Sequence, residues 1–269
     1  MSISKRLEDA RQGFARGDAT LSASAHDPAR IAQAAQERHG GASHQYIGDM
    51  VYGGLDGIIT TFAVVSGVAG AELGVHIVLI LGLANQFADG FSMATGAFLS
   101  AKSEKEYYDR ERQREAWEVE HYPEGEKAEL YELYRQQGYS DEDAARMVEI
   151  KSRDPKLWVD AMMVEELGLM PDERKPLVSA LATFVSFVVA GAVPLLVYLV
   201  GLFVPIAPQA RFFVSLGMSV LALFGLGAAK VLVTRLNPLR SGFEMLVVGG
   251  LAGAVAYGVG SLLKGIGGG

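Results

Sequence analysis

The chain has 269 residues, 50% of them hydrophobic, and a formal net charge of −7 at pH 7. Its 32 glycines and positive mean hydropathy favour a helical membrane protein over a soluble enzyme of this length. The absence of cysteine excludes disulfides, thiolate metal sites and cysteine nucleophiles. The negative charge argues against nucleic acid as a partner, because phosphate binding needs a basic surface.

The first part of the chain is polar. Residues 1–45 form an N-terminal segment rich in alanine, arginine and glutamine. No short apolar stretch follows a basic start there, so we expect no cleavable signal peptide. The first apolar span is then expected to act as its own insertion signal.

Five stretches of the chain are long and apolar enough to cross about 30 Å of hydrocarbon as helices, which takes about 20 residues each. The predicted spans are residues 47–71, 75–101, 177–203, 212–234 and 243–263. The expected fold class is therefore an all-α membrane protein with five transmembrane helices. In the last span, Gly249 and Gly253 have the spacing of small residues at close helix contacts, which is compatible with a dimer without showing one.

The first two spans differ from the others because they carry carboxylates. Asp49 lies near the start of the first span, and Asp56 lies about two helical turns deeper. A carboxylate within a span costs several kcal/mol and usually faces a bundle interior or a water-filled path. We therefore expect Asp56, and Asp89 in the second span, to be functional.

One stripe of the second span is polar. Asn85, Asp89, Ser92 and Met93 recur at helical spacing, which predicts a path for an ion along this helix. The plainer alternative is that Asn85 and Ser92 hydrogen-bond to neighbouring helices. In that alternative Met93 packs in a core.

Residues 102–176, which we call the insert, lie between the second and third spans and have a different composition. They contain 21 of the 31 acidic and 13 of the 24 basic residues, for a net charge of −8. Long runs without glycine or proline predict helices, one with Ser140 as its N-cap and one starting after Asp154 at Pro155. We expect a soluble helical domain attached to the membrane helices.

Carboxylates recur at helical spacing within the insert. Glu111, Glu115 and Glu118 share one helix face, and Glu126 and Glu129 form a second pair one turn apart. Helices that each present a pair of carboxylates are typical of iron and manganese sites in helical bundles. The insert therefore has candidate ligands for a metal ion.

Two methionines accompany these carboxylates. Met162 and Met163 precede Glu166 by four and three residues, and a thioether beside carboxylates favours a transition metal such as Fe²⁺ over Mg²⁺ or Ca²⁺. The alternative for the whole set is a solvated face with i, i+4 ion pairs, with the methionines packed in a core. The aromatic and aliphatic residues expected in that core are Trp117, Leu157 and Trp158.

The loops predict an orientation. Arg235 and Arg240 lie between the fourth and fifth spans, whereas the link between the first two spans has no lysine or arginine. The positive-inside rule then places the N-terminus and the insert in the cytoplasm, although Arg211 lies on the wrong side for this rule. A bacterial inner membrane and an organelle membrane fit equally well.

Four segments together resemble a known family. They are "YGGLDGIITTFAVVSGV", "ADGFSMATGAFLSAKSEKEYY", "REAWEVEHYPEGEKAE" and "DAMMVEELG", and in order and spacing they resemble the vacuolar iron transporter family over residues 46–269. The resemblance implies a homodimer of five-span subunits, each with a cytoplasmic metal-binding domain that grows out of the second span. It also implies transport of Fe²⁺, and in some members Mn²⁺, out of the cytosol in exchange for protons.

The resemblance also assigns roles to residues. It places Asp56 and Met93 in the transport path. Asn85 stands where some members have a glutamate, and Gln45 stands where a further glutamate is found, so Asp89 is the candidate to supply the missing charge. The metal-binding residues that it implies for the insert are Glu115, Glu118, Glu126, Glu129, Met162, Met163 and Glu166.

The expected function is export of Fe²⁺, or of Mn²⁺, Co²⁺ or Zn²⁺, by metal/proton antiport, without enzymatic activity or a prosthetic group. A buried carboxylate that exchanges its proton for a cation suffices for such coupling. The alternative is a membrane-anchored iron buffer or sensor. A ferroxidase is less expected, because di-iron bundles use two Glu-x-x-His patterns and Glu118 with His121 supplies a single one.

Overall fold

The computed structural model describes residues 5–34, 43–172, 174–231 and 237–264, and the regular elements in those ranges are all helical. This confirms the expected all-α fold class. The chain divides into two compact units, residues 1–44 and 45–269. Arg235, on which part of the predicted orientation rests, lies outside the described residues.

The first unit consists of three short helices. They are α1 (Lys5–Arg16), α2 (Ala19–Ala25) and α3 (Pro28–Ala34). Asp18 caps α2 by accepting hydrogen bonds from the backbone N–H groups of Thr20 and Leu21. Arg30 pairs with Asp9 at 2.6 Å, so the polar N-terminal segment is folded through caps and ion pairs more than through an apolar core.

The second unit contains five helices that are long and apolar enough to cross a membrane. Their elements are α4 (Ser43–Gly70), α5 (Val75–His121), α9 (Pro176–Gly191) with its continuation α10 (Leu196–Val200), α11 (Pro208–Ala229) and α13 (Pro238–Leu262). The five predicted spans are thus confirmed as helices of sufficient length. The chain has the make-up of a multi-pass membrane protein.

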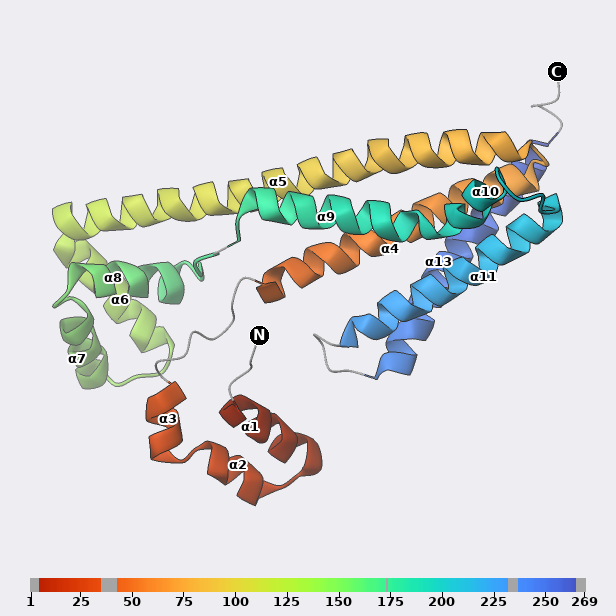
Figure 1. The fold of residues 1–269 in the computed structure, drawn as a ribbon. Helices are drawn as coiled ribbons and strands as arrows, with labels where there is room; N and C mark the ends of the chain where they lie inside the picture. Colours follow the sequence, from red (N-terminus) through yellow and green to blue (C-terminus); the bar gives the residue numbers. More distant parts are fainter. Residues whose placement is uncertain (1–4, 35–42, 173, 232–236, 265–269) are drawn as a thin grey trace. The chain divides into compact units, whose positions relative to one another are not determined.

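The second of these helices is much longer than a membrane is thick. α5 has 47 residues, which at 1.5 Å per residue makes it about 70 Å long, more than twice the hydrocarbon thickness. Residues 97–121 contain no glycine or proline that would end it. The first helix of the insert is therefore the unbroken continuation of the second span (Figure 1).

The third span is interrupted, although the sequence analysis predicted one continuous helix. Pro194 lies in a 3₁₀ turn, η2 (Val193–Leu195), because a proline inside a helix removes a backbone donor and clashes with the preceding turn. Ser215 of α11 donates a hydrogen bond to the carbonyl oxygen of Pro194 at 2.7 Å. The break is thereby stabilised from the neighbouring helix.

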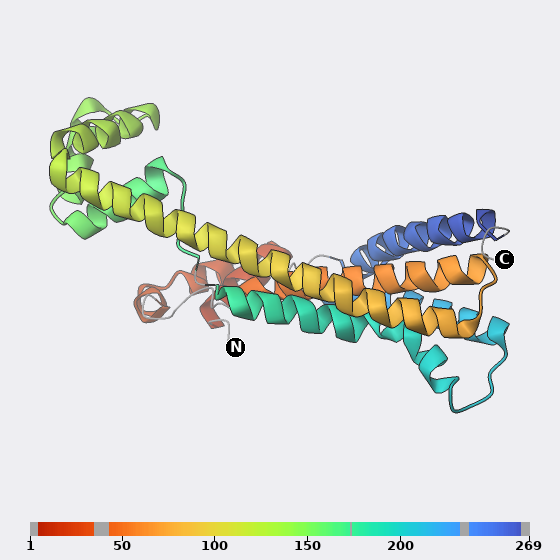
Figure 2. The ribbon, with the colours of Figure 1, turned by 90° about the horizontal axis from the view of Figure 1, so that it is seen from above.

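Helix α9 lies against both α4 and α5 (Figure 1, Figure 2). At Gly57 of α4 an added Cβ would collide with the carbonyl oxygen of Phe187 on α9, and a Cβ added at Gly191 of α9 would lie 2.8 Å from the carbonyl oxygen of Gly57. The two helices therefore touch backbone to backbone directly beside Asp56. The close helix approach beside Asp56 is thus made by two helices of the same chain.

The small residues of α13 also pack within the chain. Gly249 faces Leu223 of α11, and Gly253 faces the ring of Phe62 on α4. The predicted close packing at these glycines is confirmed, and both positions are already covered by helices of the same chain. These two glycines are therefore not available for contact with a second copy.

The other helices of the insert gather at the end of α5 farthest from Val75 (Figure 1, Figure 2). They are α6 (Pro123–Gln136), α7 (Asp141–Lys151), α8 (Pro155–Ala161) and a π-helical turn, η1 (Met162–Glu166). Ser140 accepts a hydrogen bond from the N–H of Asp143 at 3.1 Å, and Asp154 accepts one from Lys156 at 2.8 Å. The predicted N-cap at Ser140 and the predicted helix start after Asp154 are both confirmed.

An apolar core holds the insert together. Its buried residues are Val119, Leu130, Tyr134, Ala144, Val148, Trp158, Val159, Met162 and Met163. The expectation for Trp158 is confirmed, but the one for Trp117 and Leu157 is wrong, since they are 49% and 56% exposed. Trp117 lies two residues from Glu115 and from Val119, which face inward, so the helical rotation turns it outward.

Candidate metal centre and membrane path

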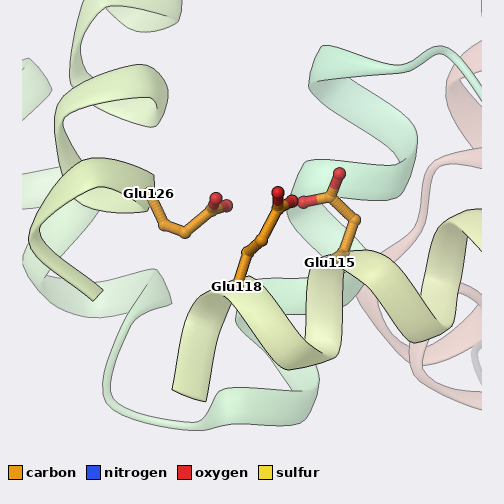
Figure 3. A group of neighbouring side chains, drawn as sticks. All are labelled: Glu115, Glu118 and Glu126. Carbon is orange, nitrogen blue, oxygen red and sulfur yellow. The ribbon is translucent and has the colours of Figure 1, made fainter. Parts of the chain in front are cut away.

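Three glutamates converge in the insert (Figure 3). Glu115 and Glu118 lie one turn apart on α5, and Glu126 lies on α6, which begins after the chain reverses at Tyr122. One carboxylate oxygen from each of the three lies within 4.8 Å of the other two. Such a spacing allows a single cation to contact all three carboxylates.

Two of these carboxylates are deeply buried. Glu115 is 1% exposed and Glu126 is 5% exposed. The Oε2 atom of each is buried and has no hydrogen-bond partner among the described residues. A buried carboxylate oxygen without a partner is costly, and a metal cation is a group that would satisfy it.

Two further glutamates act on this centre electrostatically. Burial, followed by the charges of Glu115 and Glu129, raises the pKa of Glu126 to about 7. Burial and the charge of Glu129 likewise raise the pKa of Glu166. Five of the predicted ligands therefore lie close enough to repel one another. We call them the glutamate cluster: Glu115, Glu118, Glu126, Glu129 and Glu166.

The two methionines that precede Glu166 are part of the apolar core. Met162 and Met163 are both 0% exposed. The N–H of Leu167 donates to the carbonyl oxygen of Met162 at 3.1 Å, which is the i→i+5 pattern of a π-turn, a feature frequent at functional sites. The ligand role of the methionines stays a prediction, and packing explains their burial.

One residue of this centre was missed by the sequence analysis. Arg114 pairs with Glu115 at 2.6 Å and with Glu111 at 3.0 Å, and it also contacts Glu118. The signal was present in the spacing, because Arg114 follows Glu111 by three residues and precedes Glu118 by four. The guanidinium thus supplies a positive charge at the edge of the glutamate cluster.

The polar residues of the first two spans also come together. Asp56 on α4 and Asp89 on α5 lie close enough for their charges to repel each other. Asn85 donates a hydrogen bond to Oδ2 of Asp89 at 2.9 Å. All three side chains are only partly buried, so this polar stripe lies on a face that the described chain does not fully cover.

Met93 lies on the wall of a cavity of about 420 Å³ between α4, α5 and α9. Its walls also include Asp49, for which the sequence predicted no specific role, and Arg174, to which no motif pointed. The cavity lies on the part of α5 that precedes the insert. It is a chamber with a thioether, a carboxylate and a guanidinium on its walls.

Comparison with known proteins agrees with this architecture. Residues 47–261 match the model of the VIT family. The chain belongs to the VIT family. Among its VIT-family relatives is a "Vacuolar iron transporter" of Toxoplasma gondii, which is 43% identical over 85% of this chain and 78% of that protein.

Two other VIT-family relatives are more distant. The "Vacuolar iron transporter" of Plasmodium falciparum is 33% identical over 97% of this chain and 98% of that protein. "Vacuolar iron transporter 1" of Arabidopsis thaliana is 37% identical over 79% of this chain and 84% of that protein. The family membership predicted from the four sequence motifs is therefore confirmed.

Proposed function

We propose that this VIT-family chain exports Fe²⁺, with Mn²⁺ as a second substrate, from the cytosol in exchange for protons. One observation carries the proposal: the single helix α5 bears Glu115 and Glu118 of the glutamate cluster at one end and Asn85, Asp89 and Met93 of the membrane path at the other. Relatives named as vacuolar iron transporters support iron as the cargo.

In this proposal the insert is a cytoplasmic metal-binding domain that captures the ion. The converging carboxylates with unpartnered buried oxygens provide negative charge and ligand atoms. Oxygen ligands alone would also accept Mg²⁺, so we propose that Met162 and Met163 add the softer sulfur that favours Fe²⁺. The ion is then passed along α5 towards Met93.

Exchange takes place at Asp56. A bare carboxylate among membrane helices is costly, so it is stable either with a proton or with a cation beside it. An arriving Fe²⁺ releases the proton, and a proton from the opposite side releases the ion. Asp89 and Asn85 lie next to this site and extend it along the membrane path.

The partly exposed polar stripe supports a homodimer. In a single chain, the half-buried Asp56, Asn85 and Asp89 would border lipid, where charged and polar groups are unfavourable. A second copy with its α4 and α5 packed against this face would enclose the stripe. The transport path would then run between the two subunits.

The proposed orientation places the N-terminus and the insert in the cytoplasm and the C-terminus outside. Arg240 at the start of α13 supports it through the positive-inside rule. The proposal holds for a bacterial inner membrane and for an organelle membrane alike.

The rival function is a membrane-anchored iron buffer or sensor, in which the insert binds iron but no ion crosses the membrane. Fe²⁺ uptake into proteoliposomes under reducing conditions separates the two. Transport predicts uptake by the wild type and none by Asp56→Asn, while metal binding to the insert is unchanged. Uptake by Asp56→Asn at the wild-type rate would refute the proposed path, and binding without uptake by the wild type would favour the buffer.

A further inference from the structure

We propose that Arg174 is a specificity-determining residue of the transport path, because its guanidinium competes with incoming cations for Asp49 and admits divalent ions in preference to monovalent ones. The proposal rests on the proposed transport function. It concerns the cavity between α4, α5 and α9, where a positive side chain lies on the wall of a route for cations.

Arg174 lies in the segment through which the chain returns from the insert to α9. Its Nε donates to Oδ2 of Asp172 at 2.8 Å, and its Nη2 donates to Oε2 of Glu104 on α5 at 2.6 Å. The N–H of Lys175 donates to the hydroxyl of Tyr46 on α4 at 2.8 Å. The backbone beside Arg174 is therefore fixed, while its side chain remains 25% exposed.

Asp49 is the third carboxylate near this guanidinium. Both residues line the same cavity, and Oδ2 of Asp49 is buried without a hydrogen-bond partner among the described residues. Burial by itself lowers the pKa of Arg174, but hydrogen bonding to Asp172 and the charges of Asp172, Glu104 and Asp49 raise it above its ordinary value. The charge of Asp49 thus interacts electrostatically with the guanidinium of Arg174.

The arrangement gives Arg174 two alternative positions. In one, Glu104 and Asp172 hold the guanidinium and leave Asp49 to a cation. In the other, the long side chain turns and pairs with Asp49, which satisfies the buried oxygen. Ser100, also on the cavity wall, donates to the other oxygen of Glu104 at 2.9 Å, so Glu104 is oriented at the edge of the same chamber.

Competition of this kind discriminates by charge. A monovalent ion offers Asp49 the same single charge as the guanidinium, which is already tethered nearby. A divalent ion gains about twice the Coulomb energy at the same distance and can displace the guanidinium. Na⁺ and K⁺, although far more abundant in a cell than free Fe²⁺, would then not occupy the cavity.

Transport kinetics in proteoliposomes test the competition. Arg174→Gln is expected to lower the KM for Mn²⁺ about threefold. In this variant, about 100 mM K⁺ should inhibit uptake about threefold. Arg174→Lys keeps the positive charge and should remain as resistant to K⁺ as the wild type. Glu104→Gln is expected to raise KM, because Arg174 loses a partner and turns to Asp49. Glu106→Gln, on the same helix and paired with Lys102 at 3.6 Å, is the matched control and changes neither value.

The double variant decides whether Glu104 acts through Arg174. If it does, Glu104→Gln has no effect on KM once Arg174→Gln is present, and additive effects would overturn the proposal. K⁺ resistance that survives Arg174→Gln would also overturn it. Asp56→Asn in the same series reports on the proposed function separately, since it abolishes uptake without involving Arg174.

A second measurement does not need transport. The chain has no cysteine, so Ser92→Cys places a single thiol on the cavity wall. Its reaction rates with a cationic and an anionic methanethiosulfonate reagent report the local potential. Arg174→Gln is expected to raise the cationic-to-anionic ratio about fivefold, because it removes a positive charge from the cavity wall. An unchanged ratio would refute the proposal even if the chain transports iron.

Discussion

Arg114 and Glu115 form an ion pair with 2.6 Å between Nη2 and Oε1, although the side chain of Glu115 is only 1% exposed. Arg114 also contacts Glu118, so one positive charge of the chain itself pairs with two of the three converging carboxylates. A metal ion that binds the glutamate cluster must compete with this guanidinium. We therefore expect Arg114 to lower the affinity of the glutamate cluster for a metal ion and to stabilise the metal-free insert.

The first prediction concerns Arg114→Gln in the full chain purified in detergent. We expect metal affinity to rise about tenfold, equal to about 1.4 kcal/mol, because one competing charge is removed. The melting temperature of the metal-free protein should fall by several degrees, since Glu115 loses its partner. Trp117 and Trp158 are the two tryptophans of the chain and both lie in the insert, so tryptophan fluorescence reports both quantities.

Arg112→Gln is the matched control for this prediction. Arg112 lies on the same helix, but it pairs with Asp160 outside the glutamate cluster. We expect its substitution to leave metal affinity unchanged. If both substitutions altered affinity equally, the effect would be one of general charge, and the specific role of Arg114 would be wrong.

The second prediction concerns pH and Glu126. Its pKa is raised to about 7 by burial and by neighbouring glutamates, so the folded metal-free protein favours the protonated carboxyl. The stability that Glu126 contributes is fully present below about pH 4.5, the ordinary value, and is lost as the pH rises through about 7. Glu126→Gln should melt like the wild type at pH 5 and several degrees higher at pH 8.

Glu124→Gln provides the control on the same helix. The side chain of Glu124 is 85% exposed and pairs with Lys127, so its substitution should shift the melting temperature little, and equally at both pH values. A difference between Glu126→Gln and the wild type that is as large at pH 5 as at pH 8 would contradict the assigned titration.

The third prediction concerns metal binding and removal. A metal at about 100 times its Kd should stabilise the protein by about 2.7 kcal/mol, and a chelator should reverse the shift. Protons compete for Glu126 below about pH 7, so the stabilisation at a fixed metal concentration should be smaller at pH 5.5 than at pH 7.5. Glu126→Gln should bind more weakly at both pH values. Stabilisation that does not depend on the glutamates would place the metal elsewhere.

The fourth prediction concerns the contact between α4 and α9. Gly57→Ala would place a methyl group against the carbonyl oxygen of Phe187, so it should destabilise the membrane helices by about 1–3 kcal/mol and disturb the adjacent Asp56. Gly48→Ala, on the same helix with open space around it, should be neutral or slightly stabilising. Melting monitored by size-exclusion chromatography of heated samples compares the two. Equal behaviour would show that the close approach is absent.

The sequence predicted the membrane helices well because their signal is length and hydropathy, which are local properties. It also predicted the N-cap at Ser140 and the helix start after Asp154, which depend on neighbouring residues alone. It did not predict the interruption at Pro194, because a single proline within an apolar run hardly changes the hydropathy from which the span was predicted. The predicted domain boundary at Lys102 marks a change in composition. Helix α5 continues through it because no glycine or proline interrupts the helix there.

The candidate site was less accessible from the sequence. Spacing placed Glu115 and Glu118 on one face, but only the reversal at Tyr122 brings Glu126 to them, and that is a tertiary property. Tertiary packing also decides the position of Trp117. Its hydrophobicity predicted burial, but Glu115 faces the interior of the insert, so Trp117, two residues further along the helix, faces outward. Arg174 is separated from Asp49 by over a hundred residues, so their shared cavity could not be read from the sequence.

The central claim is that metal and protons exchange at Asp56, and counting both ions in the same vesicles tests it most directly. Proteoliposomes with an acidic interior are loaded with a pH indicator and exposed to Mn²⁺ or Fe²⁺ outside. The account predicts metal uptake accompanied by alkalinisation of the interior, with both signals abolished by Asp56→Asn and retained in Glu106→Gln. Metal uptake that leaves the internal pH unchanged, or that persists in Asp56→Asn, would contradict it.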